Sequence, residues 1–173
     1  MVIDRGKLWA LASSRLFRVD LQTEEVDSFQ VGGDAIAAGA GKVWVLSRGL
    51  ATLTPVDEST GRAGDPIALP GSAPTLVTFA FDALWVSDRA DGIVTKFPVG
   101  GRGGIATVPV GTEPTEIAAG RNALWVANSG DGSVTEIEPF GATVVHTTDV
   151  GGRPTRVTVA FGRVWTTIVP PPP

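Results

Sequence analysis

The chain has 173 residues and a formal net charge of −4, with 14 basic and 18 acidic residues spread along it. An acidic balance without a basic run excludes the electropositive face that nucleic acids and anionic membranes need. The absence of cysteine excludes disulfides and thiolate metal sites. Hydrophobic residues at 43%, with 22 glycines and 13 prolines, favour an all-β domain of short strands and tight turns.

The N-terminal sequence MVIDRGKLWA lacks a basic segment followed by an apolar stretch, so it does not match a secretory signal. No apolar run approaches the roughly 18 residues that a membrane-spanning helix requires. We therefore expect no membrane span, while composition leaves the cellular compartment open.

Five tryptophans at nearly constant spacing are the strongest signal in the sequence. They are Trp9, Trp44, Trp85, Trp125 and Trp165, at intervals of 35, 41, 40 and 40 residues. Each follows an apolar residue in a short frame such as KVWVLSR, ALWVSDR or ALWVANS. A unit of roughly 40 residues with four short strands is typical of a β-propeller blade.

The best-preserved unit covers residues 111–150. Four segments with alternating apolar residues are predicted as its strands, at 114–120, 123–129, 133–139 and 143–150. The Asp131-Gly132 pair between the second and third segments is a strong hairpin signal. The unit therefore predicts a four-stranded antiparallel sheet.

The same frame extends over residues 1–169, but its two ends are incomplete. The first unit has only residues 2–4 where an inner strand is expected, and the short loop Ser13-Ser14 accounts for its shorter interval. The last unit offers two strands, at 154–160 and 163–169, before the prolines at 170–173. We therefore predict about four blades, out of phase at the termini, followed by a proline-rich tail or linker.

A row of blades that is incomplete at both ends is expected to expose unpaired strand edges and an apolar blade face. A second copy of the chain would cover both by closing a ring of about eight blades, which predicts a homodimer. The alternative is that the chain is half of a larger propeller.

The segment LWVANSGDGSVTEIEP, followed by VGGRPT, resembles the YVTN-type 40-residue repeat of bacterial β-propeller proteins. The resemblance implies that the segment beginning Pro-Thr is the innermost strand of a blade and that LWVAN is the next one out. It is also compatible with an extracytoplasmic or cell-surface location.

At the level of the fold alone, the chain resembles the streptogramin-lyase propellers, which rely on His and Glu residues around the central channel. His146, on a predicted outer strand, is the only histidine of the chain. A single chain is therefore not expected to have this lyase activity.

Polar residues recur in the turns that follow the tryptophan strands. Asp88, Arg89 and Asp91 fall in one such turn, and Asn128 and Asp131 in the next. One interpretation is a ring of carboxylates and amides that binds a cation or a polar ligand. The other is turn chemistry, because Asp and Asn side chains accept backbone hydrogen bonds and tolerate left-handed geometry. No Asp-x-Asp-x-Asp-Gly loop is present, so we predict no metal site.

A second set of candidates shares one repeat position, at the start of the predicted inner strand. Its members are Asp34, Ala73, Glu113 and Arg153. The position varies in charge and size while the frame around it repeats, as expected of a loop that carries specificity. We therefore prefer it as a ligand- or partner-binding surface near the mouth of the channel, with surface drift as the alternative.

No catalytic set or cofactor motif is apparent. The glycine pairs lack the Lys-Ser/Thr and the helix of a phosphate loop, and no nucleophile elbow is present. We predict a non-enzymatic binding or sensing module that uses loops at one face of the disc to hold a protein or a small polar ligand. The alternatives are a metal-dependent propeller lyase or hydrolase, and a structural half-ring that assembles by dimerisation.

Overall fold

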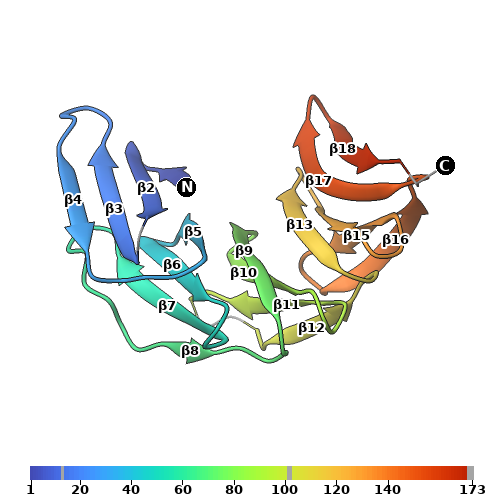
Figure 1. The fold of residues 1–173 in the computed structure, drawn as a ribbon, viewed down its shortest axis with the longest axis horizontal. Helices are drawn as coiled ribbons and strands as arrows, with labels where there is room; N and C mark the ends of the chain where they lie inside the picture. The colour runs from blue at the N-terminus through green and yellow to red at the C-terminus, as the bar shows by residue number, and fades with distance from the viewer. Residues whose placement is uncertain (13, 101–102, 171–173) are drawn as a thin grey trace. The chain divides into compact units, whose positions relative to one another are not determined.

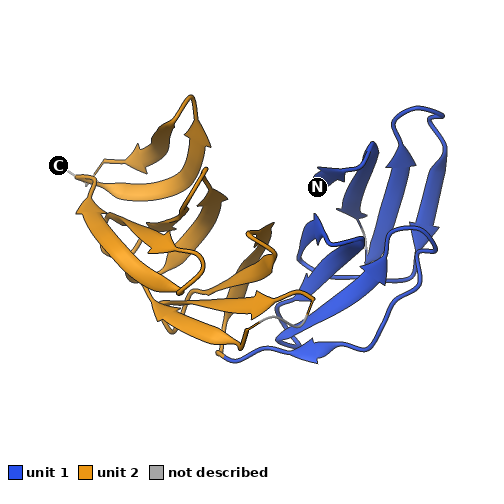
Figure 2. Cartoon of the chain, turned by 180° about the vertical axis from the view of Figure 1, so that it is seen from behind, with its two compact units in different colours: residues 1–70 blue, residues 71–173 orange. Residues whose placement is uncertain are grey.

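The computed structural model describes residues 1–12, 14–100 and 103–170. Within these residues the chain is all β, with eighteen strands, and it contains no helix that could cross a membrane. Ser13 of the predicted first loop and Pro171–Pro173 of the predicted tail lie outside the described residues. The chain divides into two compact units, Met1–Pro70 and Gly71–Pro173, which are coloured separately in Figure 2.

The first unit consists of two four-stranded antiparallel sheets whose strands follow one another in chain order (Figure 1). One sheet contains β1 (Val2–Asp4), β2 (Lys7–Ala12), β3 (Arg15–Asp20) and β4 (Val26–Phe29). The other contains β5 (Ala35–Gly39), β6 (Lys42–Ser47), β7 (Thr52–Asp57) and β8 (Ile67–Ala68). Residues 2–4, expected only as a stub, pair with β2 along their whole length and give the first sheet its fourth strand.

The second unit contains two further four-stranded sheets and one sheet of two strands. Its strands are β9 (Pro74–Ala80), β10 (Ala83–Asp88), β11 (Ile93–Pro98), β12 (Ala106–Pro109), β13 (Pro114–Ala119), β14 (Leu124–Asn128), β15 (Ser133–Glu138), β16 (Thr143–Asp149), β17 (Arg153–Ala160) and β18 (Arg163–Val169). The strands of the 111–150 unit end within one residue of their predicted positions. The prediction of four-stranded antiparallel sheets is thus confirmed, and β17 and β18 form a two-stranded sheet.

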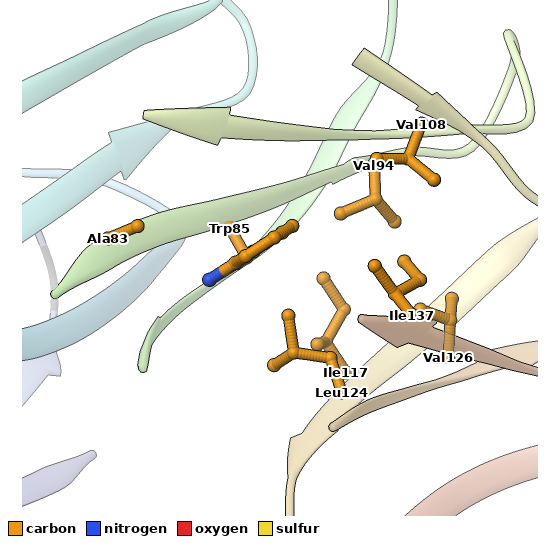
Figure 3. Packing of buried hydrophobic residues seen from close by; sticks show 8 residues of the cluster. All are labelled: Ala83, Trp85, Val94, Val108, Ile117, Leu124, Val126 and Ile137. Atoms are coloured by element: carbon orange, nitrogen blue, oxygen red, sulfur yellow. The ribbon is translucent and has the colours of Figure 1, made fainter. Parts of the chain in front are cut away.

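The hydrophobic cores lie between consecutive sheets of each unit, and a fully buried tryptophan from a second strand belongs to two of them. In the first unit, Trp9 packs with Val43, Val45 and Val56 of the following sheet. In the second unit, apolar side chains of the β9–β12 and β13–β16 sheets face one another, as Figure 3 shows: Ala83, Trp85, Val94 and Val108 on one side, and Ile117, Leu124, Val126 and Ile137 on the other. Burial of apolar area between sheets therefore holds the repeats together.

The hairpins after the tryptophan strands β10 and β14 explain why Asp-Gly pairs occur there. Gly92 and Gly132 have φ angles of +62° and +71°, a left-handed conformation that glycine adopts without steric cost. In two sheets of the second unit the last residue of the tryptophan strand also lies opposite the first proline of the inner strand: Asp88 opposite Pro74, and Asn128 opposite Pro114. Turn residues and inner-strand starts are therefore neighbours at one end of these two sheets.

Candidate functional site

Asp88 fastens its own turn to the start of the inner strand. Its Oδ1 accepts the N–H groups of Ala90 and Asp91, each at 3.0 Å, and its Oδ2 accepts the N–H of Ala73 at 2.7 Å. The residue is buried. Three backbone donors satisfy this carboxylate, so its geometry agrees with turn chemistry rather than with a free cation ligand.

The next turn uses Asn128 and Asp131 in the same way. The buried Asn128 amide donates to Ser133 Oγ at 3.0 Å and to Thr135 Oγ1 at 2.8 Å. The Oδ2 of Asp131 accepts the N–H of Thr112 at 2.8 Å, and its Oδ1 accepts the Ser133 hydroxyl at 2.7 Å. The amide nitrogen of Asn128 and both carboxylate oxygens of Asp131 are therefore engaged, whereas the buried Asn128 Oδ1 has no hydrogen-bond partner among the described residues.

Two arginine candidates of the second unit, Arg89 and Arg153, meet at the carboxylate of a third candidate, Glu113. Glu113 Oε2 lies 2.8 Å from Arg89 Nη2 and 3.6 Å from Arg153 Nη2. Ser129 completes the group, because its hydroxyl lies 3.2 Å from the Glu113 carbonyl oxygen and 3.4 Å from Oε2. We call Arg89, Glu113, Ser129 and Arg153 the Glu113 cluster.

The Glu113 cluster draws on three consecutive sheets of the second unit. Arg89 follows β10, Glu113 precedes β13, Ser129 follows β14 and Arg153 begins β17. Glu113 has a φ of +51°, a conformation that non-glycine residues seldom adopt. The backbone N–H of Ser129 donates to the carbonyl oxygen of Glu113 at 3.0 Å and so holds this turn in place.

The electrostatics of the cluster are those of an exposed cationic site with an internal carboxylate. Hydrogen bonding and charge from Arg89, with smaller contributions from Ser129 and Arg153, hold the pKa of Glu113 below its usual range. The side chains of Arg89, Glu113 and Arg153 are 51%, 40% and 62% exposed. Two guanidinium groups share one carboxylate, which leaves a positive charge and unused N–H donors facing solvent.

The remaining candidates of this repeat position have structural roles. Asp34, in the first unit, accepts the N–H of Arg48 on its Oδ2 at 2.8 Å, and its own N–H donates to the Leu46 carbonyl at 2.7 Å. It therefore joins the start of β5 to the end of β6. Ala73 contributes its backbone: its N–H donates to Asp88 Oδ2, and its carbonyl oxygen accepts the N–H of Arg89 at 3.0 Å and the hydroxyl of Thr75 at 3.1 Å.

His146 lies on β16, the outermost strand of its sheet, and its side chain is exposed. Its cross-strand partner is Glu136. Among the described residues, no group of three or more His, Asp or Glu side chains is arranged to hold a metal ion.

Ser129 is the member of the cluster that sequence reasoning missed. It occupies the same position after a tryptophan strand as Arg89 does, four residues beyond the tryptophan. A repeat alignment that carried Arg89 forward by one unit would have found it.

No model of a known protein family matches the chain, so the YVTN-type repeat is not confirmed, and no curated protein matches its sequence. The solved structures show the fold. This chain has the β-propeller fold.

The similar structures include lyases and a peptide-binding protein. Catalytically inactive virginiamycin B lyase from Staphylococcus aureus with quinupristin aligns over 94% of this chain and 59% of its own, with a TM-score of 0.78 and 18% identity. A streptogramin B lyase aligns over 97% and 60%, with a TM-score of 0.80 and 18% identity. YCF48 bound to a D1 peptide aligns over 95% and 57%, with a TM-score of 0.66 and 13% identity. The chain thus spans about 60% of the length of the lyases it matches.

Proposed function

We propose that this chain is a non-enzymatic β-propeller binding module and that the Glu113 cluster is its binding site. The observation that supports this most is the bridge from Glu113 to Arg89 and Arg153, because it gathers exposed charges from three sheets at one point. The carboxylates of Asp88 and Asp131 beside it are occupied by backbone and hydroxyl donors. Specificity then comes from residues that vary at a fixed repeat position.

The chemistry of the cluster favours a ligand with carboxylate or carbonyl oxygens. An arginine offers five N–H donors in a planar fork, and Glu113 uses only part of those of Arg89 and Arg153. A ligand carboxylate would compete with Glu113 for the two guanidinium groups. The site would therefore take the acidic side chain or C-terminal carboxylate of a peptide, or a small anionic molecule.

Two of the similar structures bear on this proposal. The propeller YCF48 is bound to a peptide, which is a precedent for peptide binding on this fold. Fold alone does not fix function, because one fold carries many sites. The inactive virginiamycin B lyase carries a histidine-to-alanine substitution, whereas the single histidine here, His146, is exposed on an outer strand. This contrast supports a binding role over lyase chemistry.

The binding site is tested with an array of short synthetic peptides that have free C-terminal carboxylates. The double variant Arg89→Gln, Arg153→Gln should lose roughly tenfold or more in affinity for the peptides that the unmodified chain binds, because both donor forks are removed. Its melting temperature should hardly change, since both side chains are exposed. Phe161→Ser, at an exposed turn outside the cluster, is the matched control.

Two results would count against the proposal. One is an array without any bound peptide, and the other is equal binding by the double variant and the unmodified chain. The second part of the proposal, that the chain is not an enzyme, is tested separately by incubation with quinupristin, followed by mass spectrometry. The expected result is intact quinupristin, and its turnover would overturn that part.

A further inference from the structure

In each unit a cation on a third strand ties two sheets together. Arg18 of β3 donates from Nη1 to the carbonyl oxygens of Glu58, at 2.7 Å, and of Ser59, at 3.1 Å, in the turn after β7. Lys96 of β11 donates in the same way to two carbonyl oxygens in the turn after β15, at 2.7 and 3.0 Å. Each cation therefore holds the turn after the third strand of the following sheet against its own sheet.

The side chains that meet at these turns differ between the two units. In the second unit the contact is aromatic, because the ring of Phe81, directly after β9, lies 6.1 Å from that of Phe140, in the turn after β15, with the edge of one toward the face of the other. In the first unit charged groups meet. Arg5, which directly follows β1 as Phe81 follows β9, has its Nη1 3.9 Å from Oε2 of Glu58. The same junction is thus apolar in one unit and ionisable in the other.

The first unit largely buries the Glu58 carboxyl group without giving it a close donor. The side chain is only 11% exposed, and its Oε1 is buried with no hydrogen-bond partner among the residues that the structure describes. Arg18 donates to the backbone of Glu58 and otherwise pairs with Asp27, at 2.6 and 3.0 Å. Arg5 makes only the long contact at 3.9 Å, and its own side chain is 68% exposed. An ionised carboxylate is costly in such surroundings.

A second carboxyl group lies against this one. Asp4, at the end of β1, is within hydrogen-bonding reach of the Glu58 carboxyl. Two ionised carboxylates only accept hydrogen bonds and repel each other, whereas one proton between them supplies the missing donor. Burial and then the Asp4 carboxyl accordingly raise the pKa of Glu58, against the charge of Arg5. Asp57 adds to this increase, and hydrogen bonds in its own turn, led by the Ser59 hydroxyl, keep its pKa well below the usual range.

We propose that Glu58 and Asp4 form a proton-operated latch between the β1–β4 and β5–β8 sheets of the first unit. In the acidic range the protonated Glu58 carboxyl donates to the Asp4 carboxylate and joins β1 to the turn after β7. As pH rises through the raised pKa of Glu58, the proton leaves and this contribution to stability is lost. The bonds of Arg18 remain, so the junction loosens without separating. The contact of Phe81 with Phe140 does not titrate, which makes the second unit an internal reference.

The first measurement follows the side-chain carboxyl of Glu58 by NMR while the pH of the full chain is varied. We expect its midpoint above the ordinary glutamate value of about 4.3, with the amide signals of residues 2–7 moving at the same midpoint. In Asp4→Asn the midpoint should fall, because the neighbouring negative charge is gone. In Arg5→Gln it should rise, because a cation that favours the ionised form is lost.

The second measurement uses Glu58→Gln, which imitates the protonated state at every pH. Near neutral pH this variant should melt roughly 2–4 °C above the unmodified chain, since its amide can donate to Asp4 and no charge is buried. Below the ordinary glutamate pKa the two should melt together. Glu138→Gln is the matched control in the second unit. The Glu138 carboxylate accepts the N–H groups of Phe140 at 2.8 Å and Gly141 at 2.6 Å, so loss of its charge should lower the melting temperature near neutral pH.

Four outcomes would overturn the proposal. One is a Glu58 midpoint at or below the ordinary glutamate value, and another is a midpoint that Asp4→Asn leaves unchanged. The third is a Glu58→Gln variant that, near neutral pH, melts no higher than the unmodified chain. The fourth is a shift of the Glu58 signals on addition of calcium at constant pH, which would assign the two carboxyl groups to a cation.

Discussion

Trp85 and Trp165 occupy the same place in two sheets of the second unit, and their surroundings differ. Both lie on the second strand of a sheet, and both donate their indole N–H to a carbonyl five residues earlier. Trp85 is fully buried against the β13–β16 sheet, while Trp165 is 52% exposed. The repeat thus sets the strand and the orientation of the indole, and the neighbouring sheet determines whether it becomes core.

The glycines that precede the inner strands β9 and β17 also differ in their surroundings. Gly71 and Gly151 occupy equivalent positions, with φ angles of +100° and +71°. A methyl group on Gly71 would overlap the carboxylate of Asp88, whereas one on Gly151 would meet nothing within 4 Å. The complete sheet has an aspartate at the end of its second strand, and the two-stranded sheet has Ile168 there.

The largest expected effect separates the two tryptophans. Trp85→Ala should lower the free energy of unfolding by about 3–5 kcal/mol, because it leaves a cavity between two packed sheets. Trp165→Ala should cost less than about 1 kcal/mol, because half of its surface is already in water. Chemical denaturation of both variants measures the difference. Equal costs would mean that Trp165 is covered in solution.

A smaller difference is expected between the two glycines. Alanine at either position must adopt a positive φ, which costs about 1 kcal/mol. Gly71→Ala must also displace the Asp88 carboxylate from its three backbone donors, so it should cost about 1–3 kcal/mol more. Thermal melts of the two variants test the order. A Gly151→Ala variant that is the less stable of the two would contradict it.

The smallest expected effect concerns the pKa of Glu113, whose carboxylate pairs with Arg89 of one sheet and Arg153 of the β17–β18 sheet. Because the pKa of Glu113 is lowered, its contribution to stability is present above the ordinary glutamate range and is lost as pH falls through the lowered pKa. Arg89→Gln should raise this pKa more than Arg153→Gln does, since Arg89 is the nearer partner at 2.8 Å against 3.6 Å. Titration by NMR of the Glu113 side chain measures both shifts, and the reverse order would contradict the geometry.

The strands were predictable because each repeat carries its own local signals. Alternating apolar residues, the Asp131-Gly132 turn and the tryptophan frame located four strands to within one residue. These signals depend on backbone conformations and side-chain periodicity, which neighbouring residues determine. The sequence left two roles open for Asp88, Asn128 and Asp131: ligand binding or turn formation. Asp88 and Asp131 accept backbone N–H groups fifteen or more residues away, and Asn128 donates to a hydroxyl on the next strand. Only the fold shows that these groups occupy the three side chains.

By itself, the sequence determined the repeat and the all-β class, because periodicity and turn chemistry are local. Only the tertiary structure decided that Glu113 joins Arg89 to Arg153 and that Trp165, alike in sequence to Trp85, stays exposed. Ion pairs and burial depend on which sheet lies next to which, and a residue's own repeat does not contain that information.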